Sequence, residues 1–323
     1  MNKIKVIVGI DISKNVFDTY SLNKGHYQYT NNISGFRLFK KSLSKAHWCI
    51  MEATSCYHYQ LACFLSKKGV NVSVVNPLII KRFIQMKLNR IKTDKSDAEM
   101  IFQYGIQQPL ELWHPNPAYI EQCKMIQTVI QLYFKQTTSI KNKIHALQSR
   151  GHIHGKMVRS LKRQLKMVLK EIEFLEIESE KLIEIHQKNL YTSIQTIPGI
   201  GRKTALLLII STNGFKDFTN AKQVSSYFGF APNERTSGSS VRGRSRISKA
   251  GNPIVRNHLF LCSFTASENN PQCKALYDRI VKKGKSKKLA LVAVCNKLIK
   301  QSFAIAKSGI PYDMNYSTKL QKQ

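Results

Sequence analysis

Four acidic residues, Asp11, Glu52, Asp94 and Asp97, are the side chains of this 323-residue chain whose types and spacing best suit them to chemistry. Acids are scarce near the N-terminus, where the first hundred residues add only Asp18 and Glu99. Carboxylates that gather at one place repel one another, and their hard oxygen atoms suit Mg²⁺ or Mn²⁺. Two such ions can activate a nucleophilic oxygen and stabilise the leaving oxygen of a phosphodiester. The four acids therefore suggest a divalent-metal site that acts on phosphodiesters.

Two strands and one helix must position these acids. Residues 4–11 predict a buried strand that ends on Asp11, because four of the five residues before it are branched and apolar. Residues 47–52 predict another strand, which ends on Glu52. The predicted order is three strands, a helix, a strand, a helix, a strand and a helix, which indicates a mixed sheet flanked by helices. If the two acid-bearing strands are parallel neighbours, both carboxylates emerge at the same edge of the sheet.

Asp94 and Asp97 open the last predicted helix of this part and, three residues apart, share one helix face. Thr93 or Asp94 could instead cap that helix, since acids suit the positive end of the helix dipole. In this alternative, Asp11 caps a turn and the other acids are capping or solvated residues. Capping does not explain why a second acid, Asp97, repeats on the same face.

The composition indicates a polyanionic partner. Lys and Arg number 51 against 19 Asp and Glu, and the formal net charge of +32 is spread along the chain. Nucleic acid would neutralise this charge, because each Lys or Arg that contacts a phosphate releases counterions. An anionic membrane surface is the alternative, but no basic amphipathic helix stands alone and no apolar run approaches the ~18 residues of a membrane span. Seven cysteines without a CxxC pair indicate a reducing cytosol, and no signal peptide is expected.

The middle of the chain predicts two long helices. Residues 110–117 contain two prolines and form a linker. Apolar residues then recur every three or four positions across 126–147 and again across 158–175, as in a helical hairpin or coiled coil. The interleaved Lys and Arg residues favour oligomerisation and nucleic-acid contact, although an ordinary solvated face has the same pattern. His152 and His154 could be a metal pair, but a polar turn explains them as well.

The third part of the chain begins with a candidate phosphate-binding turn. Residues 196–201, Thr-Ile-Pro-Gly-Ile-Gly, precede an apolar helix predicted at 204–210 and resemble a helix–hairpin–helix. The backbone N–H groups of such a turn, here around Gly199 and Gly201, can hold a DNA phosphate without reading its sequence. A tight turn of another kind could also use two glycines.

A segment rich in serine and arginine, residues 237–252, has the composition of a phosphate-binding loop. A serine hydroxyl beside arginines could also attack a phosphodiester, if a group removes its proton and cations stabilise the developing charge. Helices are predicted at 257–267 and 289–308, and the lysine run at 282–288 forms a further nucleic-acid loop. The predicted phosphate contacts of this part are Arg242, Arg244, Arg246, Lys249, Lys282, Lys283 and Lys285.

Taken together, the chain from Val8 to Asp313 closely resembles the DEDD transposases of bacterial insertion sequences. These are relatives of the Piv-type DNA invertases and include the RNA-guided bridge-RNA recombinases. The acid-bearing part also resembles the ribonuclease-H-like, RuvC-type nuclease fold, whose acids come from the first strand, the fourth strand and a final helix. The resemblance rests on an ordered set of motifs: Gly-Ile-Asp11, Met-Glu52-Ala-Thr, Val-Asn-Pro77, Lys-Thr-Asp94-Lys-Ser-Asp97-Ala, Ile-Pro-Gly-Ile-Gly201, Ser237-Gly-Ser-Ser-Val-Arg-Gly, Ile-Ser-Lys-Ala-Gly251 and Ser-Gly-Ile-Pro-Tyr-Asp313.

The resemblance implies that Asp11, Glu52, Asp94 and Asp97 bind Mg²⁺, or Mn²⁺ in its place. It implies that Ser237, the first serine of Ser-Gly-Ser-Ser, attacks the DNA and forms a covalent protein–DNA intermediate. It further implies an active site shared between subunits of a homo-oligomer, as dimers that assemble into a tetramer on DNA. The expected partners are donor and target DNA and a structured non-coding guide RNA, without a membrane, in the bacterial cytoplasm near the nucleoid.

Two other functions fit parts of the pattern. A RuvC-type structure-specific endonuclease would hydrolyse DNA with two metal ions and would not need the serine. A nucleic-acid-binding protein without catalysis would use the acids only as caps.

The expected architecture is α/β followed by α. Residues 1–108 should form an RNase H/RuvC-like mixed-sheet domain that carries the four acids. A linker at 109–117 should lead to a coiled coil or helical hairpin at 118–190. Residues 191–323 should form a mainly helical C-terminal transposase domain, which holds the helix–hairpin–helix-like motif and the serine segment.

Overall fold

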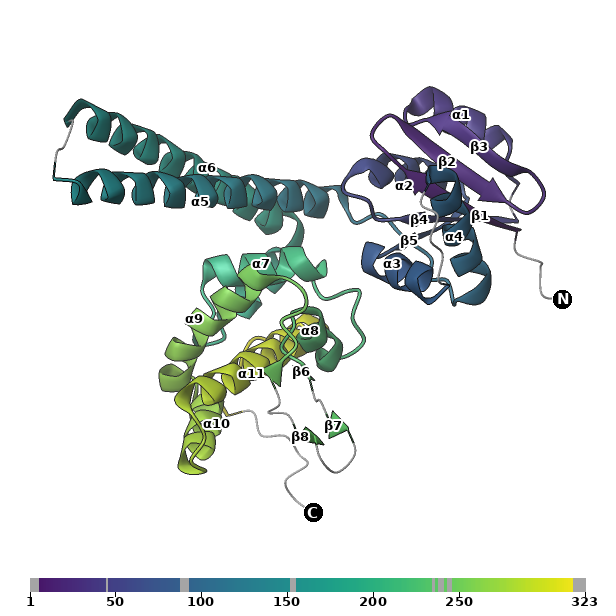
Figure 1. Ribbon diagram of the computed structural model, residues 1–323. Helices are drawn as coiled ribbons and strands as arrows, with labels where there is room; N and C mark the ends of the chain where they lie inside the picture. The colour runs from purple at the N-terminus through teal and green to yellow at the C-terminus, as the bar shows by residue number, and fades with distance from the viewer. Residues whose placement is uncertain are drawn as a thin grey trace, which may run out of the picture. The chain divides into compact units, whose positions relative to one another are not determined.

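The computed structural model describes residues 6–44, 46–87, 93–151, 155–233, 236–237, 241–242 and 246–315. The chain divides into two compact units, Met1–Pro115 and Asn116–Gln323. The first unit is built on a five-stranded sheet and the second is mainly helical, as the ribbon diagram shows (Figure 1).

The sheet of the first unit has the strand order β3-β2-β1-β4-β5. The central strand β1 pairs antiparallel with β2 and parallel with β4, so the predicted mixed sheet and the parallel pairing of the two acid-bearing strands are confirmed. Ile10 is opposite Met51, and the next residues along the two strands are Asp11 and Glu52. Both acids therefore lie at the same edge of the sheet. The strands are β1 (Val6–Ile12), β2 (Val16–Ser21), β3 (Gly25–Thr30), β4 (His47–Glu52) and β5 (Asn71–Val75).

Helices cover both faces of this sheet. α1 (Ile33–Lys41) and α2 (Tyr57–Lys67) bury the face to which Val8, Ile10 and Ile12 contribute. α3 (Pro77–Met86) and α4 (Asp94–Gln107) pack on the opposite face, where Ile7 lies in one apolar cluster with residues of both helices. Because side chains alternate along a strand, Gly9 and Asp11 share the face that α3 and α4 cover.

Gly9 lets α4 approach β1 at backbone distance. A Cβ atom at this position would lie 2.3 Å from the Ala98 carbonyl oxygen and 2.3 Å from the Phe102 nitrogen. Both obstacles are backbone atoms of a helix, which cannot move aside as a flexible side chain would. Glycine at position 9 thus sets how close the helix that begins at Asp94 comes to the strand that carries Asp11.

Gly9→Ala is expected to destabilise the first unit by about 2–3 kcal/mol, because the added methyl overpacks the contact and pushes α4 away. Urea denaturation monitored by circular dichroism measures the change in the free energy of unfolding. Gly155→Ala is the matched control, since a Cβ there meets no atom within 4 Å. Equal stability of the Gly9→Ala and wild-type proteins would show that the close approach is not required.

The second unit begins with a pair of long helices. α5 (Ala118–Ser149) and α6 (Gly155–Gln195) lie side by side as a helical hairpin, which is one of the two arrangements expected for this part (Figure 1). α6 is not continuous, because Gln187 has non-helical backbone angles of φ −141° and ψ 35°. The remaining helices pack around one large apolar core: α7 (Arg202–Thr212), α8 (Ala221–Tyr227), α9 (Pro253–Asn269), α10 (Pro271–Lys282) and α11 (Lys287–Ser308).

Several details of this unit differ from the sequence-based expectations. Helices α8 and α10 were not expected; α8 is short and polar, and α10 begins at Pro271 directly after the N-cap Asn270. The predicted lysine loop is shorter than expected, because Lys282 ends α10 and α11 begins at Lys287. The serine- and arginine-rich segment is not only loop. Together with the residues just before it, it forms the two-residue strands β6 (Pro232–Asn233), β7 (Thr236–Ser237), β8 (Val241–Arg242) and β9 (Arg246–Ile247), paired β6 with β9 and β7 with β8.

The expectation that no segment is apolar enough to span a membrane needs a correction. Within the described residues, α11 is long and apolar enough to pass a test of length and composition. Half of its most apolar stretch is buried, and Val294, Leu298 and Ile305 belong to the core of the second unit. Its apolar character is therefore explained by packing against the neighbouring helices.

Candidate active site and nucleic-acid contacts

Asp11 is the centre of the electrostatic arrangement in the first unit. Its carboxylate is partly buried, and Oδ1 accepts a hydrogen bond of 3.0 Å from the backbone N–H of Ile12. Burial, above all, raises the pKa of Asp11 from 3.8 to about 6. The negative charges of Asp97, Asp94 and Glu52 raise it further, while the hydrogen bond from Ile12 lowers it. The structure thus places Asp97, Asp94 and Glu52 within electrostatic range of Asp11.

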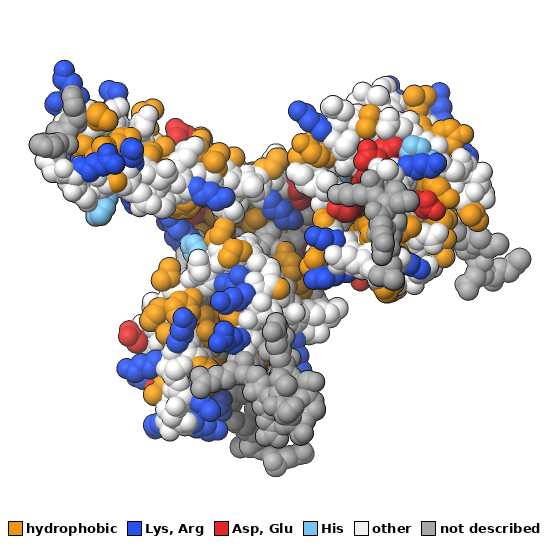
Figure 2. Space-filling model, in the orientation of Figure 1, with side chains coloured by type: hydrophobic (Ala, Val, Ile, Leu, Met, Phe, Trp, Pro, Cys, Tyr) orange, Lys and Arg blue, Asp and Glu red, His pale blue; other side chains and the backbone are white. Residues whose placement is uncertain are grey.

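The other three acids come from the elements expected to carry them. Glu52 is the last residue of β4, and Oε1 accepts a bond of 3.4 Å from the Thr54 hydroxyl. Asp94 and Asp97 lie in the first turn of α4. Figure 2 shows several acidic side chains close together on the visible face of the first unit, among hydrophobic side chains and a few Lys and Arg.

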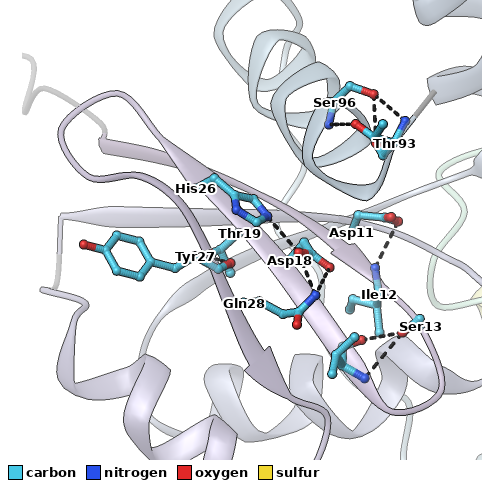
Figure 3. A network of polar contacts seen from close by, with 11 residues as sticks. Asp11, Ile12, Ser13, Asp18, Thr19, His26, Tyr27, Gln28, Thr93 and Ser96 are labelled. Atoms are coloured by element: carbon cyan, nitrogen blue, oxygen red, sulfur yellow. Dashed lines mark hydrogen bonds and ion pairs between the residues drawn. The ribbon is translucent and has the colours of Figure 1, made fainter. Parts of the chain in front are cut away.

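Capping does not account for Asp94. The Thr93 hydroxyl accepts from the Ser96 backbone N–H at 3.1 Å, and the Ser96 hydroxyl accepts from the Thr93 N–H at 2.8 Å (Figure 3). This reciprocal capping box satisfies the start of α4 without an acid. The alternative in which Asp94 caps the helix is therefore wrong, and that in which Thr93 caps it is confirmed.

The donor set fits a hard divalent cation by its chemistry. Oxygen ligands from carboxylates suit Mg²⁺ or Mn²⁺, and the nearby acids that help to raise the pKa of Asp11 are charges that a cation would offset. Among the residues that the structure describes, however, no three His, Cys, Asp or Glu side chains lie close enough together to hold an ion. A bound cation would therefore require the acids to draw closer together than they are here.

A pH dependence follows from the raised pKa of Asp11. Its folded-state value of about 6 exceeds the ordinary 3.8, so between these pH values the folded protein binds more protons than the unfolded chain. The contribution of Asp11 to stability is therefore fully present below pH 3.8 and is lost as the pH rises through about 6. In metal-free buffer, Asp11→Asn should be more stable than wild type at pH 7, by about 1 kcal/mol after allowance for partial exposure. Urea denaturation at several pH values should show this difference shrinking towards pH 4; a constant difference would contradict the assignment.

Asp18 is a buried acid beside the site that the sequence did not single out. It is opposite Asp11 in the β1–β2 register and only 3 % exposed. His26 Nε2 lies 2.7 Å from its Oδ1, and the Gln28 amide donates to both carboxylate oxygens at 3.2 and 3.3 Å (Figure 3). The charge of Asp18 is thus stabilised locally. The run Val-Phe-Asp-Thr-Tyr indicated that Asp18 lies in a strand. Only the pairing of that strand with β3 identifies the side chains that contact Asp18.

Ser237 lies in the second unit, in β7, and its backbone is opposite Val241 of β8. Arg242 belongs to the same two-stranded pair, but the side chains of both residues lie outside the description. Arg244 lies outside the described residues altogether, as do His152 and His154. Arg246 and Lys249 are exposed, and Lys249 has a positive φ of 57°. Lys282, Lys283 and Lys285 are exposed between α10 and α11.

The glycine turn before α7 packs closely against Ala266 and is followed by two ion-paired basic residues. Gly199 has φ +101°, and a Cβ there would lie 2.7 Å from the Ala266 methyl. Gly201 is the N-cap of α7 and is exposed. The first two residues of α7 are both paired with carboxylates of α6: Arg202 with Glu180, and Lys203 with Glu176 at 2.7 Å. Their charges are therefore partly neutralised, so any phosphate bound at this turn would depend on backbone N–H groups.

Known transposases are similar to this chain over most of its length. Residues 8–152 match a family model described as Transposase, of the DEDD type of IS110, and residues 191–278 match the model described as Transposase IS116/IS110/IS902 family. The pilin gene-inverting protein of Moraxella lacunata is 29 % identical over 322 residues, which cover 96 % of this chain and 98 % of that protein. Its counterpart in Moraxella bovis is 29 % identical over 325 residues, with the same coverage. The transposase for insertion sequence element IS1111A of Coxiella burnetii is 22 % identical over 331 residues, 92 % of this chain and 88 % of that protein.

Proposed function

The chain belongs to the IS110 family of transposases, enzymes that cut and rejoin DNA, and from this membership we propose that it does so by transesterification from Ser237. The observation that supports its metal-dependent part is the placement of the acids: Asp11 and Glu52 end neighbouring parallel strands, and Asp94 and Asp97 open the helix packed over β1. Burial and these three acids also raise the pKa of Asp11. Carboxylates gathered in this way are suited to bind cations, which can in turn hold a phosphate.

We assign the binding of Mg²⁺, or Mn²⁺ in its place, to Asp11, Glu52, Asp94 and Asp97. When bound, the ions would supply Lewis acidity and offset the negative charge that develops on the phosphodiester. The strand order β3-β2-β1-β4-β5, with acids on β1, β4 and a helix packed over β1, supports an RNase H-like, RuvC-type fold for this unit.

The proposed reaction forms a bond between Ser237 Oγ and a phosphorus atom and breaks the bond from that phosphorus to a DNA oxygen. The serine proton leaves to a general base, and the departing DNA oxygen ends as a hydroxyl. The phosphodiester energy is conserved in the phosphoserine bond, so the reverse attack by a DNA hydroxyl can rejoin strands. Hydrolysis by a RuvC-type endonuclease would not permit this rejoining, which DNA inversion requires.

We further propose that the enzyme works as a homo-oligomer, as dimers that form a tetramer on DNA, with acids and serine supplied by different subunits. Large apolar side chains remain exposed along the hairpin of α5 and α6, which is unusual for a solvated surface. A second copy would cover them. They are Met125, Val129, Leu132, Phe134, Met157, Met167, Leu169, Phe174, Ile177 and Ile185.

We propose donor and target DNA and a structured non-coding guide RNA as partners, at the bacterial nucleoid; the net charge of +32 supports a nucleic-acid partner in general. The experiment is to purify the protein with its bound nucleic acid, sequence the RNA, and add plasmids that carry the element's ends with Mg²⁺. Recombinant junctions that need the co-purified RNA are expected. Nicked or linear products with free ends, and no junctions, would favour the hydrolytic endonuclease instead.

A further inference from the structure

A cleft of about 600 Å³ opens in the second unit where α6 is interrupted. Gln187, the residue with non-helical backbone angles, lies in its wall, and its side-chain amide donates to the Tyr119 hydroxyl of α5 at 2.5 Å. Gly214, with φ +65°, is part of the same wall, and a Cβ there would lie 2.5 Å from Gln187 Oε1. The interruption is therefore built into the fold by three separate segments, and breaks of this kind in a long helix often mark functional sites.

Two stacked rings form one side of the cleft. The rings of Tyr119 and His186 lie 4.2 Å apart at an angle of 15°. His186 is exposed, so the stack ends at a ring that a further planar group can reach. The exposed side chain of Ile185 and the buried Ile305 add apolar surface to the lining.

Three lysines from different segments converge on the same cleft. They are Lys188 of α6, Lys216 of the segment after α7, and Lys307 in the last turn of α11, and all three are exposed. None of the residues that line the cleft is acidic, and none of the salt bridges found in the described parts of the chain engages these lysines. In contrast, Arg202 and Lys203 at the start of α7 are both paired with carboxylates. The cleft is therefore a concentration of uncompensated positive charge.

We propose that this cleft binds an unpaired nucleotide of a single-stranded nucleic acid, with the base stacked on the Tyr119–His186 pair and the flanking phosphates held by the three lysines. Aromatic platforms beside basic side chains are the usual device for single-stranded recognition, because every base has a π-face and duplex bases are already stacked. The cleft lies within the ~300–1,000 Å³ of pockets that enclose small ligands. This proposal rests on the proposed function only in taking nucleic acid as the partner.

The test uses the full-length protein in EDTA and measures fluorescence anisotropy with a labelled single-stranded RNA, a DNA of the same sequence and the DNA duplex. The cleft variant combines Lys188→Ala, Lys216→Ala and Lys307→Ala. The matched control combines Lys222→Ala, Lys274→Ala and Lys300→Ala, which remove the same charge from exposed positions of the same unit outside the cleft. The cleft variant should bind single strands about tenfold more weakly. The negative slope of its log affinity against log salt should become shallower by about 2, and the control should change the affinity and the slope less.

The stacking half of the proposal has its own measurement. His186→Ala should weaken binding of an intact single strand about 5- to 20-fold and leave binding of a fully abasic strand unchanged. Because His186 is exposed, its replacement should leave the fold intact, and a thermal melt checks this. Ultraviolet cross-linking of a 4-thiouridine strand to the wild-type protein should label the peptide that holds Tyr119 or the one that holds His186.

Two results would overturn the proposal: equal losses for the cleft and control variants, or a duplex that loses as much affinity as the single strands. A stronger effect on RNA would identify a guide RNA as the source of the nucleotide, and a stronger effect on DNA would identify a displaced DNA strand. Binding in EDTA does not depend on catalysis, so the binding measurement still tests the cleft when the wild-type protein fails to join strands. A failure of the cleft proposal can therefore be told apart from a failure of the proposed strand-joining reaction.

Discussion

Asp11→Asn is expected to slow DNA strand cleavage on the order of 10³-fold while the protein stays folded. The asparagine keeps the size of the side chain but removes the charge that would attract a divalent cation. Because that charge is partly buried among three other acids, its removal should not weaken the fold. Cleavage of a labelled donor DNA in Mg²⁺ measures the rate, and differential scanning fluorimetry with and without Mg²⁺ measures the melting temperature. Mg²⁺ should raise the melting temperature of wild type and not that of the variant.

Asp18→Asn is the matched control for this experiment. Asp18 lies on the same face of the sheet, directly opposite Asp11, but its carboxylate is bonded to His26 and Gln28. Its replacement should therefore cost about 1–3 kcal/mol of stability, since a buried charge-assisted bond is weakened, while the folded fraction still cleaves DNA. The two variants should thus separate a catalytic acid from a structural one by opposite effects. Full cleavage by Asp11→Asn, or equal destabilisation by both, would contradict the assignment.

The arrangement of the acids in the first unit was largely predictable, because each lies at the end of an element with a clear local pattern. The apolar run before Asp11 indicated a buried strand, and the strand before Glu52 followed from the same rule. Parallel pairing of these two strands then fixed both carboxylates at one edge. The Thr93–Ser96 capping box was only half anticipated, because Thr93 was a candidate but the reciprocal serine was not considered.

What could not be predicted depends on contacts between distant residues. The partners of Asp18 come from β3, and only the strand register decides which side chains face it. The interruption at Gln187 occurs in a run of ordinary helix formers; the Gln187 amide donates to Tyr119, and Gly214 leaves room for it, although both residues lie far away in the sequence. Short polar helices such as α8 lack the apolar periodicity that marks a helix. Periodicity therefore reveals elements, while the cleft and the polar network arise from how elements meet.

Ser237→Ala is expected to abolish recombination, on the order of 10³-fold or more, because no other hydroxyl is assigned to carry the DNA strand. The covalent intermediate should disappear at the same time. To detect it, the reaction is run on donor DNA labelled at the scissile phosphate, stopped in detergent, and digested first with nuclease and then with protease. Wild type should leave a labelled phosphopeptide that contains Ser237, and the variant should leave none. DNA binding should be unchanged, since the substitution removes no charge.

Ser248→Ala provides the control, because Ser248 is exposed, belongs to the same serine- and arginine-rich segment, and its hydroxyl accepts a long bond of 3.4 Å from the Ala250 N–H. The Ser248→Ala variant should recombine DNA as wild type does.

Asp11→Asn and Ser237→Ala are expected to fail for different reasons, since the first lacks the metal site and the second lacks the nucleophile. If each active site takes its acids from one subunit and its serine from another, mixing the two inactive variants should therefore restore part of the activity. If the acids and the serine must come from one chain, the mixture should stay inactive, and if Ser237→Ala alone still joins strands, the serine is not the nucleophile.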